Sequence, residues 1–357
     1  MLTRREVFKF GSAAIAATLL EPSVNGQQTT SSAQTTPVID PMSLVNPELR
    51  GGLQGMLKLS GNFPPLSPST LMKTRDMMAN LKMPMLPMPE IQERMIPGAP
   101  GDPDVRIYLA GVTPGASKPA VLHMHGGGYL IGTAANDGRD LQNLVIEHDC
   151  VAISVDYRLA PETPFPGALN DNYAALRWLS THAKELGVDS NRIAIKGESA
   201  GGGHAAALAI AARDRGEYPI CLQVLIYPML DDRTGSTVTP PPFVGRYVWT
   251  PEANRYGWTS LLGIPAGSKI VPKNSVPARV QDLAGLAPAF IGVGSIDLFA
   301  EEDIQYAARL ISSGVPTELN VVPGAFHGFE FADSPICKDF KHSWNEALRR
   351  AFTRQRP

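Results

Sequence analysis

The chain has 357 residues, with 32 Lys and Arg against 34 Asp and Glu, which gives a formal net charge of −2. This balance offers no basic surface for nucleic acid, and the three cysteines, Cys150, Cys221 and Cys337, are too few and too far apart for a disulfide framework or a zinc cluster. We therefore expect unreactive thiols, a large buried core and a small, roughly neutral partner molecule.

The N-terminus has the pattern of an export signal. Arg4 and Arg5 precede Phe8 and Lys9, and the apolar stretch that follows is too short to span a bilayer. The segment resembles a bacterial twin-arginine signal, which predicts a periplasmic or secreted protein without stable membrane insertion. The alternative is an amphipathic or disordered extension of a cytoplasmic protein. The polar stretch after it is low in complexity, so we treat residues 1–36 as signal and linker.

Residues 37–95 are rich in methionine and proline and do not alternate between strand and helix patterns. Their stretch MKTRDMMANLKMPMLPMPE is helical only in part. We predict that residues 37–95 form the first of two segments that cap a sheet.

From about residue 104 onward, short apolar runs alternate with longer helical patterns. The predicted strands read VRIYLA, AVLHMH, CVAISVDY, RIAIKG, CLQVLIYP, AFIGVG and ELNVV. Helices are predicted at 139–148, 167–185, 200–215, 301–313 and 338–353. The alternation predicts an α/β fold in which a mostly parallel sheet carries helices on both faces, with its core in residues 96–234 and 279–357.

The second predicted strand ends at His125 and runs directly into Gly126, Gly127 and Gly128. An enzyme of acyl transfer needs backbone N–H groups close to the oxyanion that develops on its substrate, and glycine permits that close approach. We assign the amides of Gly127 and Gly128 to an oxyanion hole and expect His125 to orient this loop. A flexible glycine turn is the alternative.

The stretch IAIKGESAGGGHAA contains the pattern G-x-S-x-G around Ser199. This pattern is typical of a nucleophile elbow, a sharp turn from a strand into a helix that exposes the serine hydroxyl, with the amide of Ala200 as a further oxyanion donor. Because the pattern also arises by chance, the interpretation depends on the glycine run after His125. His123 is expected inside the buried strand, and His204 is expected to pack within the helix.

Residues 235–278 interrupt the alternation a second time and contain TPPPFVGRYVWTPEANRYGWTSLLG. We predict that they form the second cap segment, over the carboxyl edge of the sheet, where sites of open α/β folds open. No substrate-binding residue is assigned individually. The two cap segments carry the large apolar side chains Met72, Met77, Met78, Met83, Met85, Phe243, Tyr247, Trp249 and Trp258, most of which should pack the cap while some line the path to Ser199.

A serine nucleophile needs a general base that a third group holds in place. His327 follows the last predicted strand, and Asp297 follows the strand before it, so both occupy the chain order that hydrolases of this kind use. The acids at 301–303 are expected in the first turn of a helix instead. Asp156 and Arg158 should form an ion pair or brace their loop.

The chain resembles the hormone-sensitive lipase-like family of α/β-hydrolases, known in bacteria as family IV. The resemblance covers residues 105–330 and is carried by HGGGY, DYRLAPE, GESAGG, GSIDLF and HGF, in consistent order and spacing. It implies an α/β-hydrolase fold with a cap subdomain. Glu198 stands where many members carry Asp or Thr, which bears on the acid–base environment rather than on the mechanism.

These observations predict a serine carboxylesterase in which Ser199, His327 and Asp297 hydrolyse short- to medium-chain acyl esters through an acyl-enzyme. No metal or organic cofactor is implied. An amidase, lactonase or deacetylase would use the same residues, and a ligand receptor on this fold is a non-catalytic alternative. The sequence leaves open whether the chain forms a homodimer.

Overall fold

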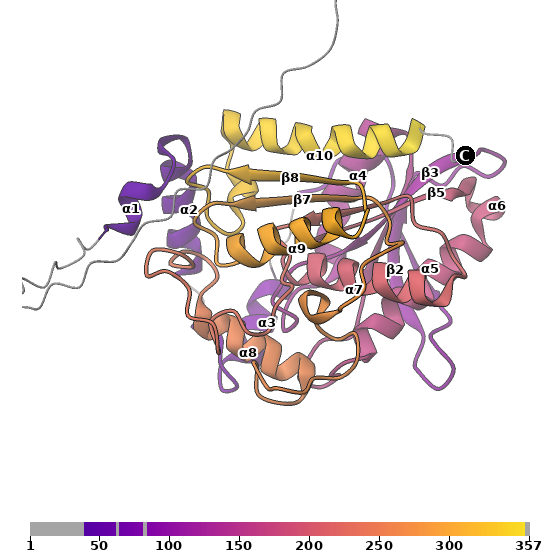
Figure 1. Cartoon of the computed structure of the whole chain (residues 1–357). Coiled ribbons are helices and arrows are strands. Elements are labelled where there is room, and N and C mark those ends of the chain that lie inside the picture. Colours follow the sequence, from indigo (N-terminus) through magenta and orange to yellow (C-terminus); the bar gives the residue numbers. More distant parts are fainter. Residues whose placement is uncertain (1–38, 62–63, 81–83, 354–357) are drawn as a thin grey trace, which may run out of the picture. The chain divides into compact units, whose positions relative to one another are not determined.

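The computed structural model describes residues 39–61, 64–80 and 84–353 (Figure 1). The predicted export signal and linker, residues 1–36, lie outside these residues. Within the described part, eight strands form one sheet in the order β1-β2-β4-β3-β5-β6-β7-β8. The strands are β1 (Gln92–Ile96), β2 (Val105–Ala110), β3 (Lys118–Met124), β4 (Val151–Asp156), β5 (Val188–Glu198), β6 (Leu222–Ile226), β7 (Ala289–Gly294) and β8 (Thr317–Val322).

Helices cover both faces of this sheet. Figure 1 shows α10 above the sheet and α5, α7 and α9 below it. The helices are α1 (Pro41–Leu44), α2 (Arg50–Ser60), α3 (Leu71–Ala79), α4 (Gly138–His148), α5 (Gly167–Thr181), α6 (Ala183–Leu186), α7 (Ala200–Arg215), α8 (Pro251–Leu262), α9 (Ala300–Ser312) and α10 (Pro335–Thr353), with short 3₁₀ turns at η1 (Pro47–Leu49), η2 (Ala134–Asp137), η3 (Pro277–Arg279) and η4 (Phe329–Phe331). The predicted fold class, a mostly parallel sheet between two helical layers, is confirmed.

The two faces of β5 show why the central strands are apolar throughout. Ile193 and Ile195 pack into the core cluster that contains residues of α5 and α7, whereas Ala194 packs into the cluster on the side of α4 and α10. Because a parallel strand between two helical layers is buried on both faces, its sequence is a nearly continuous apolar run rather than an alternation.

The edge strand β1 corrects the predicted boundary of the first cap segment. Residues 92–95 were assigned to that segment, but they pair antiparallel with β2. Four of the five residues of β1 are exposed or only partly buried, and Ile96 alone is buried. An edge strand that faces solvent carries little apolar pattern, so the sequence gives no strand signal there.

A third apolar cluster lies at the carboxyl edge of the sheet. It joins Leu71 of α3 and Trp258 of α8 to side chains that follow the parallel strands, among them Tyr129, Met229 and Phe299. Helix α8 begins at a capped N-terminus, where the Thr250 side chain accepts a hydrogen bond from the Ala253 amide. Side chains of α3 and α8 therefore pack together over the loops that follow β3, β6 and β7.

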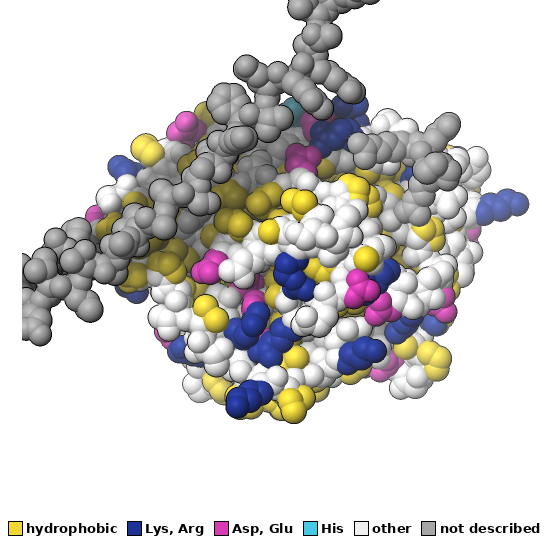
Figure 2. Space-filling model, viewed as in Figure 1, with side chains coloured by type: hydrophobic (Ala, Val, Ile, Leu, Met, Phe, Trp, Pro, Cys, Tyr) yellow, Lys and Arg dark blue, Asp and Glu magenta, His cyan; other side chains and the backbone are white. Residues whose placement is uncertain are grey.

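The surface agrees with the near-neutral composition. Figure 2 shows Lys and Arg side chains interspersed with Asp, Glu and hydrophobic side chains on one face. Cys150 and Cys337 are buried, and burial raises the pKa of the Cys150 thiol to about 12. None of the helices in the described part is long and apolar enough to cross a membrane.

Candidate active site

Ser199 lies at the sharp turn between β5 and α7. Its backbone has φ 57° and ψ −121°, a conformation that residues other than glycine rarely adopt. Three backbone hydrogen bonds fix it: the Ser199 amide donates to the Ile226 carbonyl over 2.9 Å, and the Ser199 carbonyl accepts from the amides of Gly203 and Met229 over 3.0 Å each. The surrounding structure thus maintains a strained turn that presents the serine side chain.

The glycines around Ser199 are required by close backbone contacts. A Cβ atom at Gly197 would lie 2.3 Å from the Gly201 carbonyl, and one at Gly201 would lie 2.0 Å from the Met124 carbonyl oxygen. No side chain fits at either position. The small residues of GESAGG therefore let α7 begin directly against the ends of β3 and β5.

The structure brings Ser199, His327 and Asp297 together. His327 Nε2 lies 2.9 Å from the Ser199 hydroxyl oxygen, and His327 Nδ1 lies 2.9 Å from Asp297 Oδ2. A neutral ring with its proton on Nδ1 donates to the carboxylate and accepts from the serine hydroxyl. Asp297 also accepts from the Phe299 amide over 3.0 Å.

This group of three side chains is shielded from solvent. Ser199 is 7% exposed, His327 5% and Asp297 0%. The Tyr227 and Phe299 rings meet the His327 ring edge to face, with centroids 4.8 and 5.2 Å away. Low local polarity strengthens the hydrogen bonds that orient the imidazole.

The glycine loop after β3 lies directly beside the serine. A Cβ atom at Gly126 would be 3.6 Å from the Ser199 Cβ atom. Gly127 and Gly128 have φ values of 128° and 61°, and a Cβ atom at Gly128 would lie 2.0 Å from the Trp249 ring. The positive φ angles and the close ring both require glycine.

His125 stabilises the glycine loop, as expected. Its Nδ1 lies 2.8 Å from the Gly126 carbonyl oxygen, and its ring stacks on Tyr157 with centroids 4.2 Å apart. The Tyr157 hydroxyl donates to the His125 carbonyl over 2.6 Å. Burial lowers the pKa of the His125 imidazole, which favours a neutral ring.

Asp156 and Arg158 of DYRLAPE have separate partners. Asp156 accepts from the Thr133 hydroxyl and the Ala134 amide, each over 3.0 Å, and so braces the turn after the glycine loop. Arg158 binds the buried carboxylate of Asp171 at 2.7 Å. Of the two expected alternatives, an ion pair between Asp156 and Arg158 or a brace for the loop, the structure shows the brace, and Arg158 pairs with Asp171.

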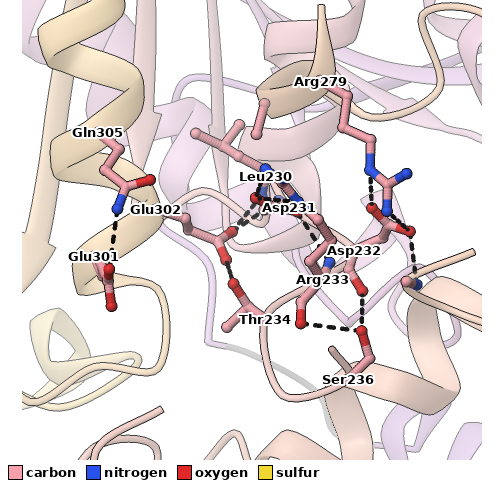
Figure 3. A network of polar contacts seen from close by, with 12 residues as sticks. Leu230, Asp231, Asp232, Arg233, Thr234, Ser236, Arg279, Glu301, Glu302 and Gln305 are labelled. Atoms are coloured by element: carbon pink, nitrogen blue, oxygen red, sulfur yellow. Dashed lines mark hydrogen bonds and ion pairs between the residues drawn. The ribbon is translucent and has the colours of Figure 1, made fainter. Parts of the chain in front are cut away.

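Glu302 anchors the loop that follows β6, although it was expected only to favour the N-terminus of a helix. Its Oε1 accepts from the amides of Leu230 and Asp231 over 2.7 and 3.0 Å, and its second oxygen contacts the Thr234 hydroxyl (Figure 3). Burial raises the pKa of the Glu302 carboxyl well above its usual range. Helix α9 thereby fixes the backbone that leads from β6 toward α8.

Trp249 belongs to the segment between β6 and α8 and contacts the glycine loop. The Asn254 side chain donates to the Thr234 carbonyl over 2.8 Å and accepts from the Trp249 ring nitrogen over 3.2 Å. The Trp249 ring contacts Gly128, as described above, and its centroid lies 6.4 Å from that of His327. Trp249 is thus a wall of the site, held by hydrogen bonds of its own segment.

Tyr227, Trp249 and Glu302 are parts of the site that no sequence motif indicates. Tyr227 lies just after β6 and Glu302 within α9, and neither belongs to a motif that sequence reasoning can assign to a site. Trp249 was included among the cap aromatics but not distinguished from them. Their roles depend on contacts between segments that are distant in the chain.

Comparisons with known proteins decide the family. A family model described as alpha/beta hydrolase fold matches residues 121–331. The chain belongs to the α/β-hydrolase family. The resemblance to its hormone-sensitive lipase-like esterases is confirmed.

Several relatives are esterases by name. Esterase LipI of Mycobacterium tuberculosis is 34% identical over 253 residues, which cover 70% of this chain and 77% of LipI. Carboxylesterase NlhH of the same species is 35% identical over 265 residues, with 71% and 81% covered. A solved bacterial heroin esterase superposes with a TM-score of 0.74 at 33% identity, over 87% of this chain and 99% of that one. The chain is therefore an enzyme of the carboxylesterase type.

Proposed function

We propose that this α/β-hydrolase cleaves carboxylic esters through an acyl-enzyme formed on Ser199. The observation that supports this most strongly is the continuous contact from Ser199 through His327 to Asp297, with both distances at 2.9 Å. The order of the three residues and their burial at the carboxyl edge of the sheet suit the same chemistry.

In the first half of the reaction, the Ser199 oxygen attacks the ester carbonyl carbon while His327 Nε2 takes the hydroxyl proton. Asp297 holds the imidazole with its proton on Nδ1 and stabilises the imidazolium that forms. When the tetrahedral intermediate collapses, His327 returns the proton to the leaving alcohol. A water molecule then attacks the acyl-enzyme, with His327 again as the base.

The negative oxygen of each tetrahedral intermediate is assigned to the amides of Gly127, Gly128 and Ala200. Two of these amides come from the glycine loop, which lies against the serine, and the third begins α7. A hydrogen-bond donor that is fixed before the reaction stabilises the oxyanion without reorganisation.

The preferred acyl chains are short to medium in length. Support comes from Trp249, whose ring lies against Gly128 and within 6.4 Å of the His327 ring, so that it restricts the space beside the nucleophile. A limited pocket gains affinity with each buried methylene until it is full, and longer chains must then protrude. We expect kcat/KM for p-nitrophenyl esters to be highest between about C2 and C8 and to fall beyond about C10.

Labelling with a fluorophosphonate tests the mechanism directly. We expect the wild type to form a covalent adduct on Ser199, and Ser199→Ala to remain unlabelled while its thermal unfolding stays close to that of the wild type. An unlabelled wild type would reject the serine mechanism. Turnover of matched p-nitrophenyl esters and anilides separates the ester hydrolase from an amidase, because the proposal requires the ester to be the better substrate.

We further propose export through the twin-arginine segment, which rests on Arg4, Arg5 and the short apolar stretch after them. Changing Arg4 and Arg5 to Lys should leave active enzyme in the cytoplasm of the native host, while the unchanged chain is found outside it. Equal fractionation of the two chains would contradict the proposal.

A further inference from the structure

A buried polar cluster lies beneath the catalytic site, on the face of the sheet that α4 and α10 cover. On this face the strands are apolar toward their amino ends, where Val121 and Ala194 belong to the core cluster. Toward the carboxyl ends the same face becomes polar, because His123 of β3 is in register with Ser154 of β4 and with Lys196 of β5. All three are at most 5% exposed.

His123 lies between two carboxylates of this cluster. Its Nε2 is 2.7 Å from Glu198 Oε2, and its Nδ1 is 3.2 Å from Asp137 Oδ2. The Ser154 hydroxyl donates to the same Asp137 oxygen over 2.5 Å. Lys196 contacts the other oxygen of Glu198. Burying so many charged groups is costly unless each one has a partner, and here each carboxylate has one.

The cluster joins the two backbone segments that must be aligned for the reaction. Glu198 immediately precedes Ser199, whose strained conformation leaves little freedom to its neighbours. His123 lies on β3, the strand that continues into the glycine loop. A further close contact supports this link, since a Cβ atom at Gly126 would lie 3.1 Å from the Glu198 carbonyl oxygen.

We propose that His123 is a positioning residue: through its contact with Glu198 it sets the distance between the Ser199 hydroxyl and the oxyanion donors of the glycine loop. The inference rests on the proposed ester hydrolysis at Ser199. It also explains how this chain accommodates glutamate at position 198. Glutamate is longer than the Asp or Thr that many family members carry there, and its carboxylate reaches the His123 imidazole on the neighbouring strand. His123 touches no reacting atom and acts only through the elbow and the loop.

The test replaces the histidine by residues that keep or remove the Nε2 contact. His123→Phe preserves the ring but cannot bind Glu198, whereas His123→Gln places an amide nitrogen near the position of Nε2. Because misplacement by about 1 Å costs up to about 100-fold in rate, we expect His123→Phe to lower kcat by about 10- to 100-fold with KM within about threefold. His123→Gln should regain most of the lost rate.

His148→Phe is the matched control. His148 ends α4 on the same side of the sheet, and its Nε2 also lies 2.7 Å from a side-chain oxygen, that of Asn345. The same chemical change there should leave kcat within about twofold of the wild-type value. If His123→Phe loses no more activity than His148→Phe, or loses it through KM alone, the positioning role is wrong.

A double variant tests whether His123 and Glu198 act together. If they do, the loss of kcat in His123→Phe combined with Glu198→Ala should be smaller than the product of the two single losses, since both changes remove the contact between His123 and Glu198. Multiplicative losses would contradict the coupling.

The rate of Ser199 phosphonylation by a fluorophosphonate provides a readout that does not depend on the ester chosen. We expect it to fall in His123→Phe by a factor similar to that for kcat and to recover in His123→Gln. Equal rates in wild type and His123→Phe would reject this inference alone. A wild type that is not labelled at all would reject the proposed function, and this inference with it.

Discussion

Two buried histidines lie near Ser199 in the sequence or in space, and their surroundings differ. His204 lies on α7 just after the nucleophile, and His327 comes from the loop after β8. Both are 5% exposed. The His204 ring packs edge to face against Tyr129 and Tyr157, with centroids 4.8 and 4.6 Å away.

The difference shows that polar partners, rather than burial or nearness in sequence, make a histidine suitable as a base. His327 has Asp297 on one nitrogen and the Ser199 hydroxyl on the other. Around His204 burial dominates and lowers the pKa of the imidazole to about 3, so the ring stays neutral and serves as packing. The two histidines should therefore respond differently to substitution.

The largest effect is expected at His327. Changing His327 to Gln removes the general base while it keeps a polar side chain, and kcat for p-nitrophenyl butyrate should fall by about 10⁴-fold or more. His204→Phe should keep kcat within about threefold of the wild type. If His327→Gln retained a tenth of the wild-type kcat, another residue would have to be the general base.

The aromatic surroundings of His327 should control acyl length. Trp249→Ala removes a ring that contacts Gly128, so the pocket should accept longer chains. Each methylene that becomes buried is worth up to about 0.8 kcal/mol, or about fourfold in kcat/KM. We expect the optimum of a C2 to C12 p-nitrophenyl ester series to move toward longer chains. An optimum unchanged in Trp249→Ala would mean that Trp249 does not limit the acyl group.

The smallest effect concerns stability at His204. Because its folded-state pKa lies below the unfolded value of 6.5, the stabilisation is complete above pH 6.5 and is lost as pH falls toward about 3. The loss attributable to His204 should reach about 2 kcal/mol at pH 5. Denaturant unfolding of wild type and His204→Phe at pH 7.5 and 5 measures it. Parallel losses in the two proteins would contradict the assigned burial effect.

The sequence predicted those parts of the molecule that follow from local pattern. The parallel strands are apolar because both faces are buried. G-x-S-x-G and H-G-G-G contain glycine because positive φ angles and close backbone contacts exclude other residues, and this requirement is visible as a short sequence motif. Ser199, His327 and Asp297 each follow a strand of the parallel sheet, so fold and chain order together were enough to place them at one edge.

The features that the sequence did not predict depend on contacts between side chains that are distant in the chain. Asp171 as the partner of Arg158 and His123 as the partner of Glu198 join residues from different strands and helices. No local pattern distinguishes Glu302, which anchors a distant loop, from Glu301 beside it, which binds Gln305 within its own helix. Strand β1 was missed because its solvent-facing residues have no apolar alternation.

Trapping the acyl-enzyme tests the central claim most directly. Wild-type protein is mixed with an excess of a p-nitrophenyl ester, quenched in acid within the first turnovers, and mapped by mass spectrometry. The proposed mechanism predicts an acyl group on the peptide that carries Ser199, and none on Ser199→Ala. An acyl group on any other residue, or sustained ester turnover by Ser199→Ala, would contradict it.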